Sequence, residues 1–153
     1  MALTITSPAF KPGERIPTKY TRDGENKSPP LAWHDPPPET KSFLILVEDS
    51  DAPSGTFRHW AMYNIPASET GLPEGASSQG RSGAGEGVNG FGNARYDGPQ
   101  PPKGHGPHHY HVRLAALDLP QLNIAASAKA EDVWARAQPH IIAEAELIGT
   151  YER

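Results

Sequence analysis

Proline and glycine constrain the fold of this chain more than any other feature of its sequence. The 153 residues include 17 prolines and 15 glycines, and both residue types interrupt the interiors of helices and strands. Hydrophobic residues make up 36% of the chain, which is low for a globular protein, but the composition stays short of that of disordered chains. It predicts a fold rich in strands and loops.

Length, charge and cysteine content narrow the class of protein. A chain of 153 residues falls within the usual size of one domain, so we expect residues 1–153 to form a single domain. The formal net charge is −4 and Lys and Arg are scattered, so nucleic acid is not expected as a partner. The absence of cysteine excludes disulfides and thiolate chemistry and is compatible with a reducing cytosol.

Neither secretion nor a membrane span is indicated. Residues 1–6 carry no basic region and no long apolar region, and prolines follow early at Pro8 and Pro12. No apolar run approaches the roughly 20 residues that a transmembrane helix needs. We therefore expect a cytoplasmic protein without a transmembrane segment.

Four segments have the hydrophobic patterns of strands. Ser42–Glu48 is a continuous β-rich apolar run, which predicts a central strand buried on both faces. Trp60–Ile65, which Pro66 ends, predicts the neighbouring strand. His109–Leu117 alternates between apolar and polar residues and predicts a strand with one solvated face. Ile141–Tyr151 predicts a final strand.

One helix and a long loop region complete the pattern. Lys129–Gln138 predicts a helix, with Ser127 as a candidate N-cap and Pro139 closing it. Pro73–Gly106 is dense in Gly, Ser and Pro, and long loops in a compact domain usually carry function. Within it, Gly85–Gly90 matches the spacing of dinucleotide-binding loops but neither follows a predicted strand nor opens a helix. We expect these glycines to serve turns with positive φ.

Polar residues that could take part in binding or catalysis follow the first predicted strand. Asp49 and Asp51 lie directly after it, and His59 begins the partner strand, so a hairpin-like connection would bring His59 beside Asp49. The structural alternatives are an Asx-type turn for the aspartates and a single structural hydrogen bond for the histidine.

A second polar group ends the long loop. Prolines and glycines fix the segment Tyr96–Tyr110, which closes in His108-His109-Tyr110 at a strand entrance. His108 and Tyr110 are two residues apart and therefore share one face of an extended chain. His105 and His109 are expected to be exposed.

The order and spacing of three motifs resemble the phosphatidylethanolamine-binding protein family, in particular its bacterial Raf kinase inhibitor-like branch. The motifs are Asp49-Ser50-Asp51-Ala52-Pro53, His59-Trp60, and Tyr96-Asp97-Gly98-Pro99 through His108-His109-Tyr110. The similarity extends from about Phe10 to Tyr151. Together with the strand pattern it implies a mainly β fold, in which a central antiparallel sheet packs on a second, smaller sheet with one or two peripheral helices.

The resemblance also implies a pocket for phosphate, acetate-like anions and phosphoethanolamine head groups, with no metal and no organic cofactor. The residues that would line the pocket are Asp49, Asp51, His59, His108 and Tyr110, with Gly98 and Gln100 in the loop at its rim. The chain differs from the family at two positions. Gln100 stands where bacterial members often carry cysteine, and His109 stands where arginine is common.

The leading functional hypothesis is a binding protein that is not an enzyme. Imidazole and phenol donors would receive a small phosphorylated or carboxylate anion, while Asp49 and Asp51 orient the histidines. The alternative is a cofactor-independent acid-base hydrolase or isomerase that uses the same groups, with a metal hydrolase as a variant. No nucleophile elbow or similar activated nucleophile is recognisable. A third hypothesis is regulation of a protein partner, for which the sequence identifies no docking surface.

Three further expectations concern geometry, assembly and pH. The resemblance suggests a cis peptide bond at Ala52-Pro53 and a homodimer. Imidazoles with pKa values near the reference of about 6.5 would hold an anion better when protonated, so affinity should weaken as pH rises through neutrality. Replacement of His59 or His108 by Ala is expected to remove binding and to leave thermal stability nearly unchanged.

Overall fold

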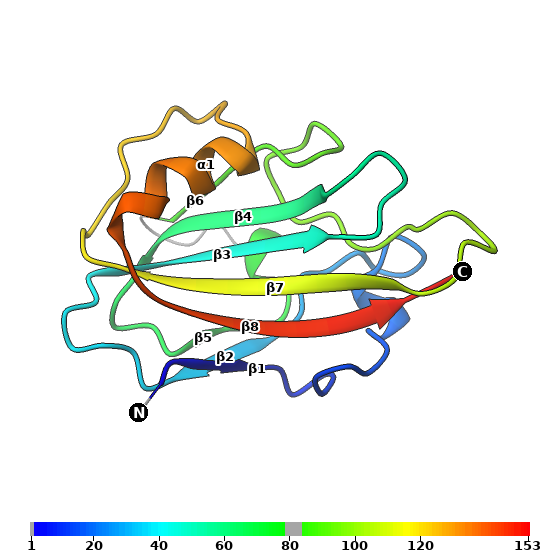
Figure 1. Ribbon diagram of the computed structural model, residues 1–153, viewed down its shortest axis with the longest axis horizontal. Helices are drawn as coiled ribbons and strands as arrows, with labels where there is room; N and C mark the ends of the chain where they lie inside the picture. The colour runs from blue at the N-terminus through cyan, green and yellow to red at the C-terminus, as the bar shows by residue number, and fades with distance from the viewer. Residues whose placement is uncertain (1, 79–83) are drawn as a thin grey trace.

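Two antiparallel sheets form the framework of the protein in the computed structural model, which describes residues 2–78 and 84–153 (Figure 1). The large sheet has the strand order β6-β4-β3-β7-β8, and the small sheet has the order β1-β2-β5. The strands are β1 Thr4–Thr6, β2 Leu31–His34, β3 Ser42–Asp49, β4 Phe57–Pro66, β5 Gly71–Leu72, β6 Gly85–Glu86, β7 His108–Leu117 and β8 Ile141–Tyr151. The helices are α1 Ala130–Ala137 and the 3₁₀ helices η1 Thr18–Tyr20, η2 Ala76–Ser78 and η3 Gln138–His140. The predicted mainly β architecture is confirmed.

Strand β3 lies at the centre of the large sheet, between β4 and β7, and is buried on both faces as its apolar sequence predicts. Phe43 and Val47 pack into the core between the two sheets, whereas Leu44 and Leu46 lie on the opposite face, because successive side chains of a strand alternate. Trp33 of β2 packs on Phe43, with 5.3 Å between the ring centroids. The small sheet therefore closes the inner face of the large one.

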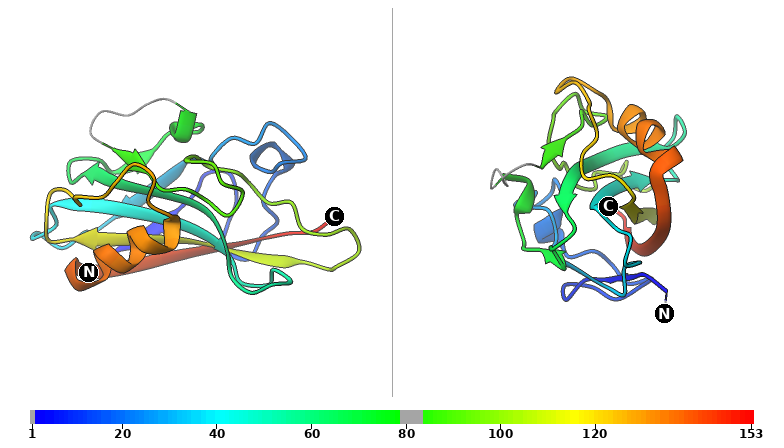
Figure 2. Two further views of the ribbon diagram at one scale, coloured as in Figure 1. Left: turned by 90° about the horizontal axis from the view of Figure 1, so that it is seen from above. Right: turned by 90° about the vertical axis from the view of Figure 1, so that its left-hand side faces the viewer.

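Helix α1 covers part of the outer face of the large sheet, on the side away from the small sheet (Figure 2). Val133 and Ala137 of α1 form one apolar cluster with Ala115 and Leu117 of β7. The outer face of β7 is therefore solvated only over its first half. The residues predicted on the solvated side, His109, His111 and Arg113, are exposed or half-buried, and the helix that follows later in the chain covers the rest of the outer face.

The start of α1 is fixed by the backbone. Lys129 occupies the N-cap position without a side-chain capping bond, so the prediction of Ser127 as the cap is wrong. The Val88 amide donates to the Ala128 carbonyl at 2.8 Å, and the Ala130 amide donates to the Val88 carbonyl at 2.9 Å. This short parallel bridge sets the entry of the chain into the helix and makes a hydroxyl cap unnecessary.

The glycines of the segment 85–90 have a packing role. Neither Gly85 nor Gly90 has positive φ, so the predicted turn role is wrong for both. A Cβ atom at Gly85 would collide with the ring of Tyr63, and one at Gly90 would collide with the ring of Phe57. The segment opens no helix, as expected from its sequence context.

The peptide bond between Ala52 and Pro53 is trans, which corrects the expected cis bond. The Gly55 amide donates to the Ala52 carbonyl at 3.1 Å, so residues 52–55 form a turn with proline in its second position. Proline is favoured there with a trans bond, since its fixed φ suits that position, whereas cis proline belongs one position later.

Candidate functional site

Polar residues from three strands meet at one end of the large sheet. Antiparallel pairing places the end of β3 beside the starts of β4 and β7, with Asp49 opposite both Phe57 and Tyr110. Their inward-facing side chains surround a cavity of about 200 Å³. The cavity is lined by Asp49, Ala52, Pro53, Phe57, His59, Phe91, Gln100, Pro101, Pro102, His108 and Tyr110. Five of the seven predicted site residues are among them.

The Asp49 carboxylate and the His108 imidazole form a buried pair. His108 Nδ1 lies 2.6 Å from Asp49 Oδ2, and both side chains are almost fully buried. The Asp51 amide donates to Asp49 Oδ1 at 2.8 Å, so the expected Asx-type turn exists as well. Because a carboxylate only accepts, Nδ1 of His108 carries the proton, and Nε2 is the nitrogen that remains for another partner.

That partner is His105. Its Nδ1 lies 2.6 Å from His108 Nε2, so one ring donates a hydrogen bond to the other. His105 is exposed, as predicted, but it extends the pair into a chain Asp49–His108–His105. Sequence reasoning missed this role, because the curvature of the Pro-Gly loop that returns His105 onto His108 leaves no periodic signal.

His59 reaches the pocket through a bulge in β4. The register passes from Val47 opposite Trp60 to Glu48 opposite Arg58, so His59 is the extra residue. The bulge lets His59 and Trp60 both face inward, which simple alternation forbids. Burial lowers the pKa of His59, against the opposing effect of the Asp97 carbonyl, which accepts a bond from His59 Nδ1 at 2.7 Å. His59 is therefore neutral at neutral pH.

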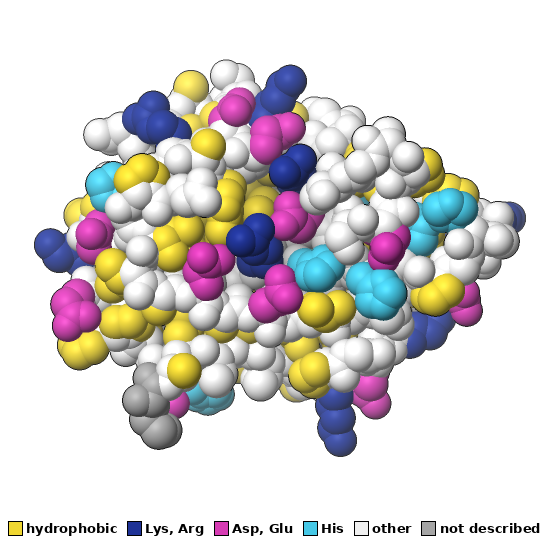
Figure 3. All heavy atoms as spheres, viewed as in Figure 1, with side chains coloured by type: hydrophobic (Ala, Val, Ile, Leu, Met, Phe, Trp, Pro, Cys, Tyr) yellow, Lys and Arg dark blue, Asp and Glu magenta, His cyan; other side chains and the backbone are white. Residues whose placement is uncertain are grey.

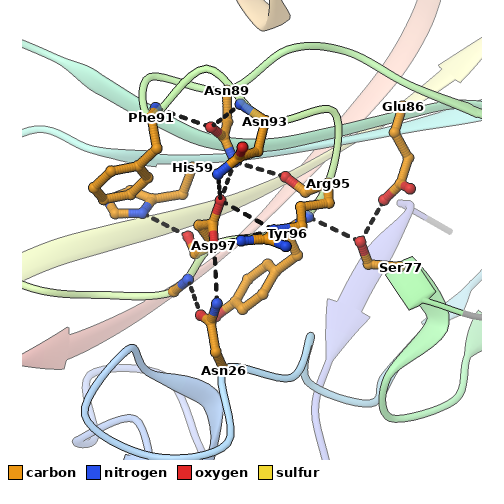
Figure 4. A network of polar contacts seen from close by, with 11 residues as sticks. Asn26, His59, Ser77, Glu86, Asn89, Phe91, Asn93, Arg95, Tyr96 and Asp97 are labelled. Carbon is orange, nitrogen blue, oxygen red and sulfur yellow. Dashed lines mark hydrogen bonds and ion pairs between the residues drawn. The ribbon is translucent and has the colours of Figure 1, made fainter.

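A polar network behind the pocket holds Asp97 and, through it, His59 (Figure 4). The buried Asp97 carboxylate accepts bonds from Asn26 at 2.9 Å, Asn89 at 2.8 Å and Asn93 at 3.0 Å. Arg95 lies 3.3 Å from the same carboxylate. Burial acts to raise the pKa of Asp97, but these donors outweigh it and hold the pKa below its ordinary value. Sequence reasoning missed this network, because its members are separated by up to 71 residues.

Tyr110 supplies the most exceptional polar atom of the pocket. Its hydroxyl is buried and has no partner of normal hydrogen-bond geometry among the described residues. Burial, followed by the nearby Asp49 charge and by hydrogen bonding to the Asp49 carboxylate, raises the pKa of Tyr110, so the phenol stays protonated and remains a donor. A buried hydroxyl without a well-formed hydrogen bond costs free energy, which a better-placed acceptor in the cavity would offset.

Aromatic rings form the apolar wall of the pocket. Phe57 packs on His59, with 4.9 Å between the ring centroids, and on Phe91, with 4.8 Å. The guanidinium of Arg22 lies over the ring of Phe91, 4.2 Å from the ring centroid. A positive charge therefore stands beside one of the rings that line the pocket. The sequence carried no signal for Phe91 or Arg22, since neither lies on a predicted element.

Two predicted site residues do not line the cavity. Asp51 faces outward, where its carboxylate accepts bonds from the His109 amide and lies 2.7 Å from His109 Nδ1. These bonds lower the pKa of Asp51. The Gly98 amide donates to Asn26 Oδ1 at 2.6 Å, and a Cβ there would collide with the Tyr20 carbonyl. Asp51 and Gly98 therefore shape the loops, whereas Gln100 lies in the rim as predicted.

The described residues 2–78 and 84–153 contain no cluster of three or more His, Cys, Asp or Glu side chains placed to hold a metal ion. No helix among them has the length and apolarity needed to cross a bilayer.

The two-sheet fold and the pocket at the sheet end define a class of small β proteins with a His- and Tyr-lined pocket. Residues 6–152 match the family model of the phosphatidylethanolamine-binding proteins. The chain belongs to this family, as its motifs indicate.

Known proteins agree with this assignment. The chain is 41% identical over 152 residues to a UPF0098 protein of Aquifex aeolicus, covering 99% of this chain and 89% of that protein. It is 43% identical over 153 residues to a UPF0098 protein of Methanothermobacter thermautotrophicus, covering 99% of both chains.

Two crystal structures share the fold. Escherichia coli YbcL, described as a new member of the mammalian PEBP family, superposes with a TM-score of 0.95 at 35% identity, covering 100% of this chain and 99% of that one. The Chlamydia trachomatis homologue CT736, described as a putative member of the family, has a TM-score of 0.89 at 38% identity, covering 99% and 98%. The fold is therefore that of the family.

Proposed function

We propose that the pocket binds a small anion, namely phosphate, a carboxylate or a phosphoethanolamine-type head group, without turnover. The observation that carries this proposal is the buried Tyr110 hydroxyl, a donor in the cavity lining that lies near the Asp49 carboxylate but makes no hydrogen bond of normal geometry. An anionic oxygen would satisfy it with a charge-assisted hydrogen bond, which is about twice as strong as a neutral one.

Other features of the pocket support the same ligand. The Asp49 carboxylate already accepts bonds from His108 and from the Asp51 amide, which reduces its repulsion of an incoming anion. The cavity of about 200 Å³ suits a head group better than a whole lipid. The Phe57 and Phe91 rings offer a surface for the ammonium end of phosphoethanolamine through cation–π attraction.

The pH dependence of the proposal differs from the sequence-based expectation. His59 has a lowered pKa and is neutral at neutral pH, so it does not supply the positive charge. His59 and His108 are also buried and hydrogen-bonded, so replacement by Ala should reduce stability, contrary to the expectation of little change. Smaller changes are needed to test the site.

Titration calorimetry with phosphate, phosphoethanolamine and acetate tests the proposal on Tyr110→Phe, which removes the hydroxyl alone. We expect phosphate affinity to fall about tenfold or more, because a donor to a charged acceptor is lost. Tyr63→Phe is the matched control, since Tyr63 packs in the apolar cluster under α1, away from the pocket. Equal affinities in the wild type and Tyr110→Phe would contradict the proposal.

Three finer points belong to the same proposal. We propose that the protein is cytoplasmic and forms a homodimer. We also propose that its ligand-bound state could regulate a protein partner. The acid-base enzyme alternative would use the chain Asp49–His108–His105 as a proton path. Turnover of phosphoethanolamine, followed by phosphorus NMR, distinguishes the alternative from binding alone.

A further inference from the structure

A second group of functional side chains lies on the outer face of the large sheet. A cavity of about 380 Å³ opens there, lined by Glu48, Ser50, Thr56, His111, Arg113, Glu144, Ala145 and Glu146. Figure 3 looks onto this face, where acidic, basic and histidine side chains gather over the strands of the large sheet. The cavity shares no lining residue with the anion pocket, because alternate residues of β3 and β7 face opposite sides.

Three side chains in this cavity form a linear hydrogen-bonded chain. Ser50 Oγ lies 2.9 Å from His111 Nε2, and His111 Nδ1 lies 3.2 Å from Glu146 Oε2. Since a carboxylate only accepts, Nδ1 of His111 carries the proton, and Nε2 accepts the bond from the serine hydroxyl. This is the order of groups that activates a serine in acyl-transfer enzymes: nucleophile, base and orienting carboxylate.

We propose that Ser50, His111 and Glu146 form a nucleophilic site for small carboxylic esters. The register of the sheet holds the three residues together. His111 lies opposite Glu48, so it stands next to the end of β3 where Ser50 follows. Glu146 lies opposite Arg113, two residues from His111 on the same face, which makes it the diagonal neighbour of His111. The Ser50 amide donates to the His109 carbonyl at 3.3 Å, which fixes the serine backbone.

The proposed reaction is acyl transfer through Ser50. Ser50 Oγ bonds to the ester carbonyl carbon as its proton passes to His111 Nε2. The bond from that carbon to the alkoxy oxygen then breaks, and His111 returns the proton to the leaving alcohol. Water repeats the sequence on the acyl-serine, which releases the carboxylic acid and restores the Ser50 hydroxyl. Glu146 stabilises the imidazolium formed in each half of the reaction.

The charges of the cavity select the class of ester. Glu48, Glu144 and Glu146 contribute three carboxylates, and Arg113 is the one guanidinium among the residues that line the cavity. Arg113 is itself bound to Glu48 at 2.9 Å and to Glu144 at 3.2 Å. Neutral or cationic esters should therefore be accepted, and anionic esters should be disfavoured by repulsion. The Arg113 guanidinium and the Thr56 hydroxyl are the side-chain donors available to a developing oxyanion.

Covalent labelling and ester hydrolysis test the inference on the full chain. With p-nitrophenyl acetate, we expect the wild type to exceed the buffer rate by about 100-fold or more, and Ser50→Ala to return to it. Glu146→Gln should lower the rate at least about tenfold. Phenylmethylsulfonyl fluoride should add one sulfonyl group to the wild type, which peptide mapping places on Ser50. Ser54→Ala, the same change at an exposed residue of the neighbouring turn, should behave as the wild type.

Two results would overturn the inference: hydrolysis or labelling that persists in Ser50→Ala, or a wild type that neither hydrolyses the ester nor takes the label. Phosphate affinity provides an independent readout. It should be equal in Ser50→Ala and the wild type, because Ser50 does not line the anion pocket. The two proposals therefore succeed or fail separately.

Discussion

His105 occupies the one nitrogen of His108 that the buried pair with Asp49 leaves available. Since Nδ1 holds the ring proton, Nε2 accepts, so a phosphate that bonds to it has to donate its P–OH group and to displace this exposed side chain. We predict that His105→Ala tightens phosphate binding by up to about tenfold, because a competing hydrogen bond worth about 1 kcal/mol is removed. Titration calorimetry measures the change.

The matched control for this change is His109→Ala. His109 is also an exposed histidine of the same segment, but it pairs with Asp51 on the outer side. Its removal should leave phosphate affinity unchanged. Weaker binding in His105→Ala would show instead that His105 is a ligand of the anion.

His59 should make the stability of the protein sensitive to acid. Burial lowers its pKa in the folded state, so below about pH 6.5 the unfolded chain binds more protons at this residue than the folded one. Stability should therefore fall as pH is lowered through this range. In His59→Asn, whose amide nitrogen can replace Nδ1 as the donor to Asp97, this part of the pH dependence should disappear. Urea unfolding of both proteins between pH 5 and about pH 8 gives the free energy of unfolding at each pH. Identical slopes of this free energy against pH in the two proteins would contradict the assignment.

Three of the five predicted residues that line the cavity have positions that follow from alternation along a strand. His108 and Tyr110 are two apart in β7, and Asp49 ends β3, so their common inward direction could be predicted. His59 fits its place only through the bulge in β4, which depends on tertiary contacts with Asp97. The triad of the outer face was missed because it depends on the register of three strands.

At the scale of elements, Asp97 links parts of the loop 87–107 to one another and ties the loop to Asn26. Its buried carboxylate accepts bonds from three asparagine amides and from Arg95. Asp97→Asn would replace one acceptor oxygen by an NH₂ group, and this donor would face the asparagine and Arg95 donors. We predict a loss of about 2 to 3 kcal/mol in the free energy of unfolding, measured by urea denaturation.

The same substitution at an exposed aspartate provides the control. Asp118 pairs with His140 at 3.1 Å, and about half of its side chain is exposed, at 49%. Asp118→Asn should cost less than about 1 kcal/mol, since exposed ion pairs contribute little. A loss in Asp97→Asn no larger than in Asp118→Asn would mean that the network does not stabilise the loop.

The four long strands and the helix could be predicted because their signals are local, whereas the short strands β1, β2, β5 and β6 were not predicted. The apolar run of β3, the alternation of β7 and the boundaries of β8 appear directly in the sequence, and the structure matches Ile141–Tyr151. The loops could not be predicted, because hydrogen bonds between distant residues fix them, such as Asn26 to Asp97. The same reason explains the wrong N-cap, since Val88 pairs with the segment before α1.

At the scale of the whole molecule, the homodimer remains a prediction. Strand β8 is an edge of the large sheet, and Ile142 within it is 38% exposed, one of two large hydrophobic residues so exposed in the described part of the chain. We expect light scattering to give twice the chain mass of 16.5 kDa, and Ile142→Lys to shift the population toward the monomer. A monomer mass for the wild type at all concentrations would contradict this.

The proposed anion-binding function depends on an anion that binds at the buried Tyr110 hydroxyl. The most direct test is a crystal structure of the protein grown with phosphate, compared with a phosphate-free crystal of the same form. We expect phosphate density in the cavity between Asp49, His59 and His108, with an oxygen about 2.6 Å from Tyr110 Oη. Phosphate bound only elsewhere, or a cavity that stays free of it at saturating concentration, would contradict the proposed anion binding at Tyr110.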